Sequence, residues 1–175
     1  SVYRIPVNFA DQKVDEIVLD LLKIEAGPRN LEPWKEMLDR LTHPKDDVVI
    51  GIVGKYVDYE DSYKSLKESL LHGGLAHTLR TRIKWIESES ITRESAAREL
   101  SEVDGILVPG GFGNRGIDGM LEGIRYAREN KIPYFGICLG MQTAIIEFAR
   151  NVCGIEDSHS SEFAPECDNA VIALM

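Results

Sequence analysis

The sequence lacks the features that would direct it to a nucleic acid, a membrane or an oxidising compartment. Lys and Arg number 20 against 29 Asp and Glu, so the net charge is −9, whereas attraction to phosphate needs clustered positive charge. The three cysteines are too few for a disulfide framework or a Cys-rich zinc site. No apolar run approaches the roughly 20 residues of a membrane span, and no signal peptide opens the chain. These absences predict a cytoplasmic protein with free thiols, no bound metal, and neither a nucleic acid nor a membrane as partner.

Two segments of different character follow one another along the 175 residues. Residues 1–46 hold a short piece, 1–10, that we expect to be extended, and two amphipathic helices, 11–24 and 31–41, each followed by a proline-containing stop. No strand separates these helices, and their apolar stripes need another surface to cover them. We therefore predict that residues 1–46 are an interdomain linker or docking arm.

From residue 47 onward, short apolar runs alternate with helical periodicity. The run Val48–Val53 is typical of a strand buried on both faces, and the segment 155–169 reads as a loop. Alternation of this kind predicts an α/β fold, an open doubly wound and mostly parallel sheet flanked by helices, flavodoxin-like, over residues 47–175. The further strands are expected at 82–86, 104–108, 132–136 and 170–175, and the helices at 61–77, 92–100, 117–127 and after 140.

Ligands of such sheets bind outside the carboxyl ends of the strands, where two unusual loops follow Val108 and Phe135. The second loop, residues 136–140, reads Gly-Ile-Cys-Leu-Gly between a strand and a helix, which is the pattern of a nucleophile elbow. Side chains at Gly136 and Gly140 would collide with the neighbouring strand and helix. The helix N-terminus favours the reactive thiolate, so Cys138 is the candidate nucleophile. A buried cysteine that acts as a small apolar residue is the alternative. In the helix that follows, we expect Ala144, Ile145 and Phe148 to face inward.

The first loop, residues 109–113, reads Pro-Gly-Gly-Phe-Gly. Its glycines do not have the spacing of a dinucleotide fingerprint, and it lacks the Lys-Ser/Thr of a phosphate-binding loop. A glycine pair can turn backbone N–H groups toward a developing oxyanion. The amides of Gly111 and Leu139 together would form an oxyanion hole. An ordinary glycine turn is the alternative.

Five ordered blocks of the sequence are similar to the class I glutamine amidotransferase family, and within it to the CTP synthases. They are Gly54–Ser65, Pro109–Gly116, Arg125–Gln142, Glu147–Val152 and Ser161–Glu166.

The resemblance implies a role for each matching residue. Cys138 would attack the side-chain amide of glutamine, form a glutamyl thioester and release ammonia, while Gly111 and Leu139 would hold the oxyanion. Gly140 and Met141 would line the glutamine pocket through their backbone, and Gln142 and Glu162 would bind the substrate. From the residues alone, Gln142 is a polar side chain on a first helical turn, and Glu162 is a solvated loop carboxylate.

The resemblance also implies partners. L-glutamine would be the substrate, and ammonia would pass to a synthetase domain of the same polypeptide that binds ATP, UTP and Mg²⁺, in a homotetramer; this chain itself would hold no cofactor. GTP would be an allosteric activator that acts on a lid. The residues that match its site in the family are Lys55, Lys64, Arg115, Gly116 and Asp118, where Asp118 replaces the usual glutamate. Flexible surface cations are the alternative interpretation of the two lysines.

One expected element is missing. A thiol nucleophile needs a base oriented by a third group, and in this family both belong to a downstream His-Pro-Glu motif that does not occur in the sequence. We expect the four histidines, His43, His72, His77 and His159, not to replace it. The sequence therefore predicts an N-terminal part of a glutaminase domain, with weak or no hydrolysis of glutamine by this chain alone.

Three other interpretations stay open. Other class I amidotransferases, such as GMP synthetase or carbamoyl-phosphate synthetase, share the cysteine turn but lack the Gly54–Ser65 and Ser161–Glu166 blocks in this form. A non-catalytic flavodoxin-like binding or assembly module would make Cys138 incidental, and it would not require glycines around it. A PfpI-type peptidase would place a histidine directly after the cysteine, where this sequence has Leu139.

Overall fold

The computed structural model of the chain describes residues 1–55 and 60–173. Residues 56–59, inside the Gly54–Ser65 block, and residues 174–175, at the end of the last expected strand, lie outside the described residues. The chain divides into two compact units, one formed by Ser1–Asp47 with Leu71–Arg80 and the other by Val48–Leu70 with Thr81–Met175.

The first unit is helical at its N-terminal end. Its elements before residue 47 are η1 (Val2–Arg4), α1 (Ile5–Asp11), α2 (Val14–Leu22) and α3 (Glu32–Thr42). The prediction of an extended piece at 1–10 is wrong, because most of these residues are helical. Pro6 lies in the first turn of α1, where backbone N–H groups have no acceptor inside the helix, so a proline there costs no hydrogen bond. The two predicted helices are confirmed as α2 and α3, and the apolar side chains Val18, Leu21 and Leu22 of α2 are exposed.

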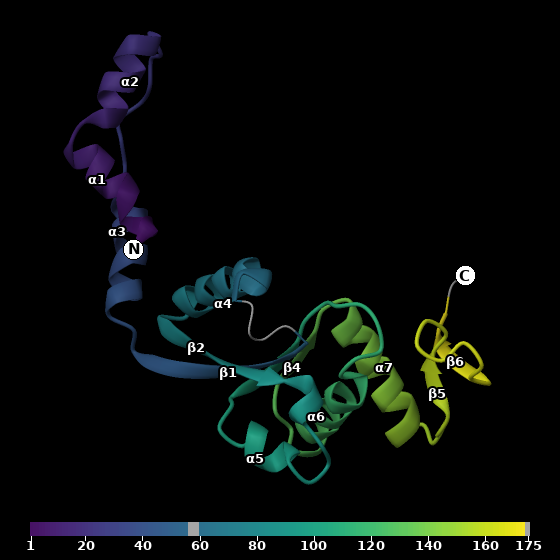
Figure 1. Cartoon of the computed structure of the whole chain (residues 1–175). Helices are drawn as coiled ribbons and strands as arrows, with labels where there is room; N and C mark the ends of the chain where they lie inside the picture. The colour runs from purple at the N-terminus through teal and green to yellow at the C-terminus, as the bar shows by residue number, and fades with distance from the viewer. Residues whose placement is uncertain (56–59, 174–175) are drawn as a thin grey trace. The chain divides into compact units, whose positions relative to one another are not determined.

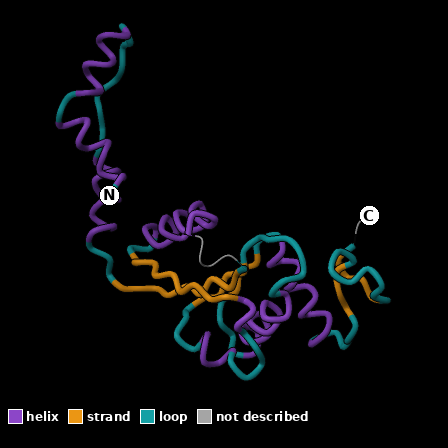
Figure 2. Tube along the Cα trace, viewed as in Figure 1, coloured by secondary structure: helices purple, strands orange, loops and turns teal. Residues whose placement is uncertain are grey.

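A four-stranded sheet forms the centre of the second unit, in the order β2-β1-β3-β4 (Figure 2). β1 pairs with β3, and β3 with β4, in parallel, with Ile52 opposite Leu107 and Leu107 opposite Phe135. This strand order is the flavodoxin-like one, whose order reverses between β1 and β3. The predicted parallel α/β fold is confirmed. The strands are β1 (Asp46–Gly54), β2 (Leu79–Glu87), β3 (Gly105–Val108) and β4 (Tyr134–Gly136).

The main hydrophobic core lies between this sheet and helices α5, α6 and α7. Val53, Ile106 and Val108 from the strands pack against Leu100 of α5 and Met120 of α6, and all five are buried. Figure 1 shows α5 and α6 together on one side of the strands. The remaining helices are η2 (Glu60–Tyr63), α4 (Lys64–Ala76), η3 (Ser88–Ser90), α5 (Ala96–Leu100), α6 (Ile117–Glu129) and α7 (Leu139–Asn151).

Helix α7 differs from expectation in the face that it buries. Of the three residues expected inward, Ala144 packs half-buried against the core, but Ile145 and Phe148 are 41% and 52% exposed, whereas Thr143, Ile146 and Glu147 are buried. The sequence of α7 has apolar residues on two faces, so its periodicity alone does not say which face is buried. Gly140 lies against β3, and this contact turns the residues on the same face as Gly140, such as Thr143, toward the sheet.

The segment 155–169, expected to be a loop, contains a strand. β5 (Ser158–Ser160) pairs in parallel with β6 (Asn169–Ile172) to form a separate two-stranded sheet. The strand was missed because Ser-His-Ser carries no apolar alternation. The expected last strand is confirmed over its described part as β6.

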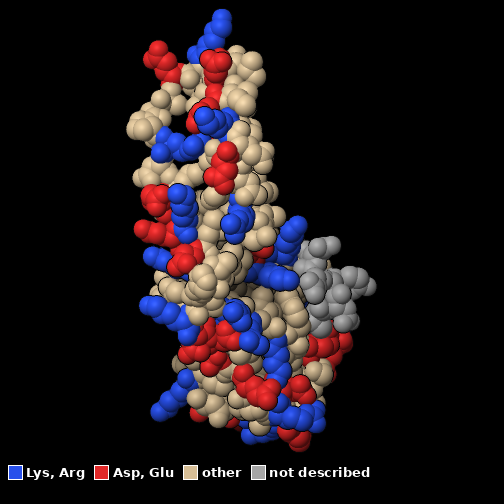
Figure 3. Space-filling view, turned by 90° about the vertical axis from the view of Figure 1, so that its left-hand side faces the viewer, with Lys and Arg blue, Asp and Glu red and all other residues tan. Residues whose placement is uncertain are grey.

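The surface is mixed in charge. On the face shown in Figure 3, acidic and basic side chains are interspersed, and neither sign forms a continuous field. Among the described residues, no helix combines the length and the apolar character needed to cross a membrane.

Candidate active site

Cys138 lies in a strained turn between β4 and α7, in the five residues 136–140 that we call the cysteine turn. Its φ of 51° is in the left-handed region, which a residue with a side chain rarely adopts, and its thiol is free and exposed. Cys138 is the N-cap residue of α7. The turn therefore presents the sulfur to solvent at the positive end of a 13-residue helix.

Both flanking glycines are required by close contacts. A Cβ at Gly136 would lie 2.5 Å from the carbonyl carbon of Gly140, and a Cβ at Gly140 would lie 2.1 Å from the carbonyl oxygen of Val108 in β3. These contacts are with backbone atoms, which cannot rotate away as a flexible side chain can. The predicted steric reason for the two glycines is confirmed.

Hydrogen bonds hold the cysteine turn against the sheet. The Tyr134 hydroxyl donates to the Gly140 carbonyl at 2.7 Å, and the Ile137 amide donates to the Val108 carbonyl at 3.0 Å. The buried Thr143 hydroxyl donates to the Leu139 carbonyl at 3.0 Å. Burial raises the pKa of the Tyr134 phenol, so it keeps its proton as the donor. As the first residue of α7, Leu139 has an amide with no acceptor inside the helix.

Residues 109–113, which we call the glycine loop, follow β3 directly and lie beside the cysteine turn. A Cβ at Gly110 would lie 3.6 Å from the Cβ of Cys138, and one at Gly111 would lie 3.2 Å from the Cδ2 of Leu139. The structure thus brings together Cys138, Leu139 and Gly111, the three residues of the expected nucleophile and oxyanion site. They lie at the carboxyl ends of β3 and β4, as expected for a ligand site in this fold.

Lys55, directly after β1, contacts the same loop. Its side chain is buried, with 3% exposure, and its ammonium donates to the carbonyl of Phe112 at 3.0 Å and to the carbonyl of Gly113. Burial, together with the nearby Arg115 cation, lowers the pKa of Lys55. Sequence reasoning placed Lys55 in a GTP lid and missed these contacts; its position at the end of a buried strand, facing the glycine loop, was the available signal.

The expected glutamine-binding residues lie around this centre. Gln142 is half-buried on the first turn of α7, and Met141 is exposed beside it. Glu162 is an exposed carboxylate whose amide donates to the Ser160 hydroxyl at 3.2 Å. The Asn114 side chain, just after the glycine loop, donates to the Phe163 carbonyl at 3.4 Å and joins the segment of Glu162 to that loop.

The residues expected at a GTP site are only partly brought together. Arg115 donates to the backbone carbonyl of Lys55 and to the Glu89 carboxylate at 3.3 Å. Gly116 has a φ of 70° and ends the turn into α6, whose first turn carries the exposed Asp118. Lys64 is the exposed first residue of α4.

Three of the four histidines, His43, His72 and His159, have other partners. His43 contacts Asp39 at 2.8 Å, and His72 contacts the Tyr3 hydroxyl at 2.8 Å. The His159 ring accepts from the Ser160 amide at 2.9 Å, and burial lowers its pKa. Among the described residues, no histidine is hydrogen-bonded to the thiol of Cys138, and no group of three or more His, Cys, Asp or Glu residues is placed to hold a metal ion.

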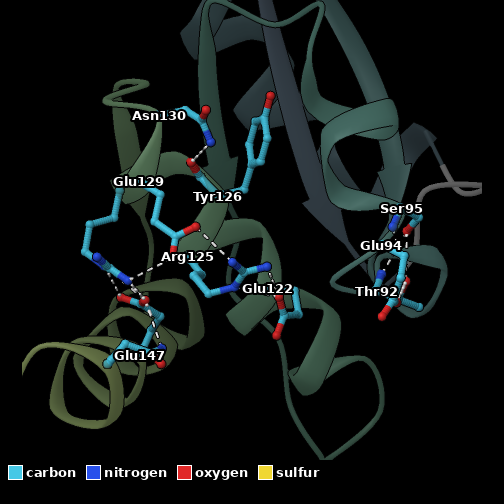
Figure 4. Close-up of polar contacts among 11 residues, drawn as sticks. Thr92, Glu94, Ser95, Glu122, Arg125, Tyr126, Glu129, Asn130 and Glu147 are labelled. Carbon is cyan, nitrogen blue, oxygen red and sulfur yellow. Dashed lines mark hydrogen bonds and ion pairs between the residues drawn. The ribbon is translucent and has the colours of Figure 1, made fainter. Parts of the chain in front are cut away.

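An ion pair between a half-buried arginine, Arg128, and a buried glutamate, Glu147, joins α6 to α7. The Glu147 carboxylate, with the residue 1% exposed, accepts from Arg128 at 2.8 Å and from Asn151 at 3.0 Å (Figure 4). On α6 itself, Arg125 donates to Glu122 and Glu129. Helix α7 is therefore tied to the last turn of α6.

Comparison with known proteins places these features in a family. The family model for glutamine amidotransferase class-I matches residues 59–169. CTP synthase of Koribacter versatilis is 58% identical over 98% of this chain, and that of Desulfitobacterium hafniense is 53% identical over all of it. The chain spans about a third of these relatives, 31% and 33% of their lengths. Among solved structures, the Trypanosoma brucei CTPS glutaminase domain with bound acivicin is similar, with a TM-score of 0.69 and 43% identity over 73% of this chain and 50% of that one.

Proposed function

The chain belongs to the class I glutamine amidotransferase family, and we propose that it carries the nucleophile half of the glutaminase site of a CTP synthase. The observation that carries this proposal is the position of Cys138: exposed, backbone-strained, and beside the glycine loop. A merely packed cysteine would require none of these three features.

The chemistry follows from the groups that surround the sulfur. The Cys138 thiolate attacks the side-chain carbonyl carbon of glutamine, and the carbonyl oxygen takes up the negative charge. The amides of Gly111 and Leu139 donate to this oxyanion. As the intermediate collapses, the amide nitrogen takes a proton from a general acid and leaves as ammonia. A glutamyl thioester remains, which water then cleaves to glutamate and the free thiol.

Substrate binding uses the residues around that centre. Glu162 is suited to the α-ammonium group of glutamine, because its carboxylate is exposed next to the glycine loop. Gln142 and the backbone of Gly140 and Met141 line the side-chain pocket. The family resemblance assigns the base that the thiol requires, and the carboxylate that orients it, to a His-Pro-Glu motif that these 175 residues do not contain, so we expect them alone to hydrolyse glutamine weakly or not at all.

Labelling tests the nucleophile. The full-length protein is treated with 6-diazo-5-oxonorleucine, a glutamine analogue that alkylates an activated thiol, and the adduct is located by mass spectrometry. The proposal expects the adduct on Cys138 and its loss in Cys138→Ala. The matched control is Cys153→Ala, which removes another exposed thiol and keeps the labelling. Absence of an adduct on Cys138 in the parent protein contradicts the assignment.

The wider activity belongs to the same proposal. Ammonia passes to a synthetase domain that uses ATP, Mg²⁺ and UTP to form CTP, in a cytoplasmic homotetramer. The similarity to CTP synthases along the whole chain supports this interpretation over other amidotransferases. Glutamine-dependent formation of CTP by the full-length protein tests the activity. The molar mass of the full-length protein, measured by light scattering, tests the homotetramer.

GTP activation is proposed for the surface around Arg115, Gly116 and Asp118, with Lys55 and Lys64. The contact of Arg115 with the Lys55 backbone supports a shared site, and the exposed Lys64 supplies a cation for a phosphate. The test is the ratio of glutaminase rates with and without GTP. This ratio is expected to fall toward one in Lys64→Ala, and an unchanged ratio contradicts the assignment of Lys64.

A further inference from the structure

The glycine loop has no polar side chain with which to hold its own shape. Its residues are Pro109, Gly110, Gly111, Phe112 and Gly113, and the one large side chain, Phe112, is 83% exposed. Glycine backbone is also the most free to rotate. A donor amide that must meet an oxyanion within a few tenths of an ångström therefore needs an anchor from elsewhere.

Lys55 supplies that anchor. Among the described residues, the only polar contacts of residues 110–113 are those from the Lys55 ammonium to the carbonyls of Phe112 and Gly113. The stem of the lysine runs past Gly111, since a Cβ there would lie 3.9 Å from Lys55 Cδ. The side chain thus spans the loop from its donor residue to its far end.

Packing alone does not explain a lysine at this position. Burying an ammonium costs free energy that an apolar side chain of similar length would not cost. Within the described part of the chain, no carboxylate lies within 4.0 Å to form an ion pair with it, and the charge with the largest effect on its pKa is the like-charged Arg115. The more distant Glu162 and Glu89 carboxylates favour the charge, but the direct partners of the ammonium are the two loop carbonyls.

The position of Lys55 in the fold fits this role. It follows β1, and the glycine loop follows β3, so the contact crosses the point at which the strand order reverses. Both ends of the contact are therefore fixed by buried strands, Val53 and Val108 being 0% exposed.

We propose that Lys55 is a positioning residue for glutamine hydrolysis, whose ammonium holds the glycine loop so that the Gly111 amide meets the oxyanion. The inference rests on the proposed function and goes beyond it, because it gives Lys55 a role that does not involve GTP. Lys55 acts through the loop and touches neither the sulfur nor glutamine. Its loss should lower the rate of the chemical step without changing glutamine affinity or the reactivity of the thiol.

The test uses the full-length protein with Lys55→Met, which keeps most of the apolar stem and removes the ammonium, and Lys55→Gln, which keeps a polar end that is one atom too short to reach the carbonyls. Lys84→Met, which removes a surface lysine that pairs with Glu102 at 3.5 Å, is the matched control. Three quantities are measured without GTP and again with it: kcat for glutamine, KM for glutamine, and the rate of alkylation of Cys138 by iodoacetamide. Alkylation passes through no oxyanion, so it separates the thiol from the loop.

The expected result is a fall of about 100-fold in kcat for both Lys55 variants, the size of a lost oxyanion donor. KM and the alkylation rate stay within twofold, the fall is the same with and without GTP, and Lys84→Met matches the parent. A kcat within threefold of the parent overturns the inference. So does an equal fall in alkylation, a fall seen only with GTP, or failure of both variants to fold. If the parent itself neither hydrolyses glutamine nor is labelled at Cys138, the proposed function fails instead.

Discussion

The contact of Gly140 with β3 makes a quantitative prediction for Gly140→Ala. The added Cβ would lie 2.1 Å from the Val108 carbonyl oxygen and 3.0 Å from the Val108 Cβ. An ordinary contact of these atoms needs about 1 Å more, so the start of α7 must move away from the strand.

The cost can be worked from what that movement disturbs. Leu139, Thr143 and Ile146 of α7 are at most 1% exposed, so the shift loosens a fully packed interface, and overpacking of this kind costs about 3 kcal/mol. The hydrogen bond from Tyr134 to Gly140 is worth about 1 kcal/mol more. Alanine recovers about 1 kcal/mol over glycine in a helix. The net loss is about 3 kcal/mol.

Hydrogen exchange of the α7 amides in the full-length protein measures this loss locally, because exchange reports the free energy of opening of each segment. A loss of about 3 kcal/mol corresponds to a fall in protection of about 100-fold. The matched control is Gly73→Ala in α4, where a Cβ would meet nothing within 4 Å. There the same chemical change should raise protection of α4 by about fivefold.

Unchanged protection of α7 in Gly140→Ala, within threefold, would refute the reasoning. It would mean that α7 does not approach β3 at this glycine, and the steric account of the cysteine turn would fail with it. A rise in protection would contradict that account even more strongly.

Three further predictions concern the supports of the site. Glu147→Ala should destabilise α7 by about 2 kcal/mol in the same exchange measurement, because it removes the buried carboxylate that accepts charge-assisted hydrogen bonds from Arg128 and Asn151, while the half-exposed Glu129→Ala should cost under about 1 kcal/mol. Tyr134→Phe should cost about 1 kcal/mol, since it removes the donor to the Gly140 carbonyl, and an unchanged urea midpoint would contradict this. Because burial lowers the pKa of His159, the unfolded chain binds its proton more readily; stability should fall as pH drops below about 6.5, and His159→Gln should reduce that fall in urea titrations at about pH 7 and pH 5.

The central sheet could be predicted from the sequence because strands that are covered on both faces consist of continuous apolar runs. The run Val48–Val53 has no polar residue, and in β1 it is half-buried over its first three residues and fully buried over the rest. Strands covered on both faces have this pattern wherever they occur, so the pattern alone is sufficient. The strand order could not be read in the same way, since it depends on pairing between segments that are distant in the chain.

The errors fall where local pattern is weak. Ser158–Ser160 is a three-residue polar strand that exists because β6 pairs with it. Ile145 and Phe148 were assigned to the core because α7 has two apolar faces, and only the contact of Gly140 with β3 decides between them. Both outcomes depend on tertiary contacts.

The cysteine turn could be predicted because glycine spacing carries its geometry, and the positive φ of Cys138 agrees with that interpretation. The roles of Gly111, Gln142 and Glu162 stay predictions that depend on the family resemblance. The anchoring contacts of Lys55 and Tyr134 could not be foreseen, since nothing in a sequence states which carbonyl a lysine or tyrosine will reach.

The link between α6 and α7 has a mechanical consequence. Glu147 and Arg128 join α7 to the last turn of α6. Near the other end of α6, Gly119 lies so close to Ser88 that a Cβ at Gly119 would be 1.7 Å from the Ser88 carbonyl oxygen. Because α6 is held at one end by α7 and near the other end by Ser88, it has little freedom to slide or rotate alone. A signal received near Arg115 would therefore reach the sulfur through the backbone of residues 109–116 and through the contacts of Lys55 with that backbone, more directly than by the displacement of a helix.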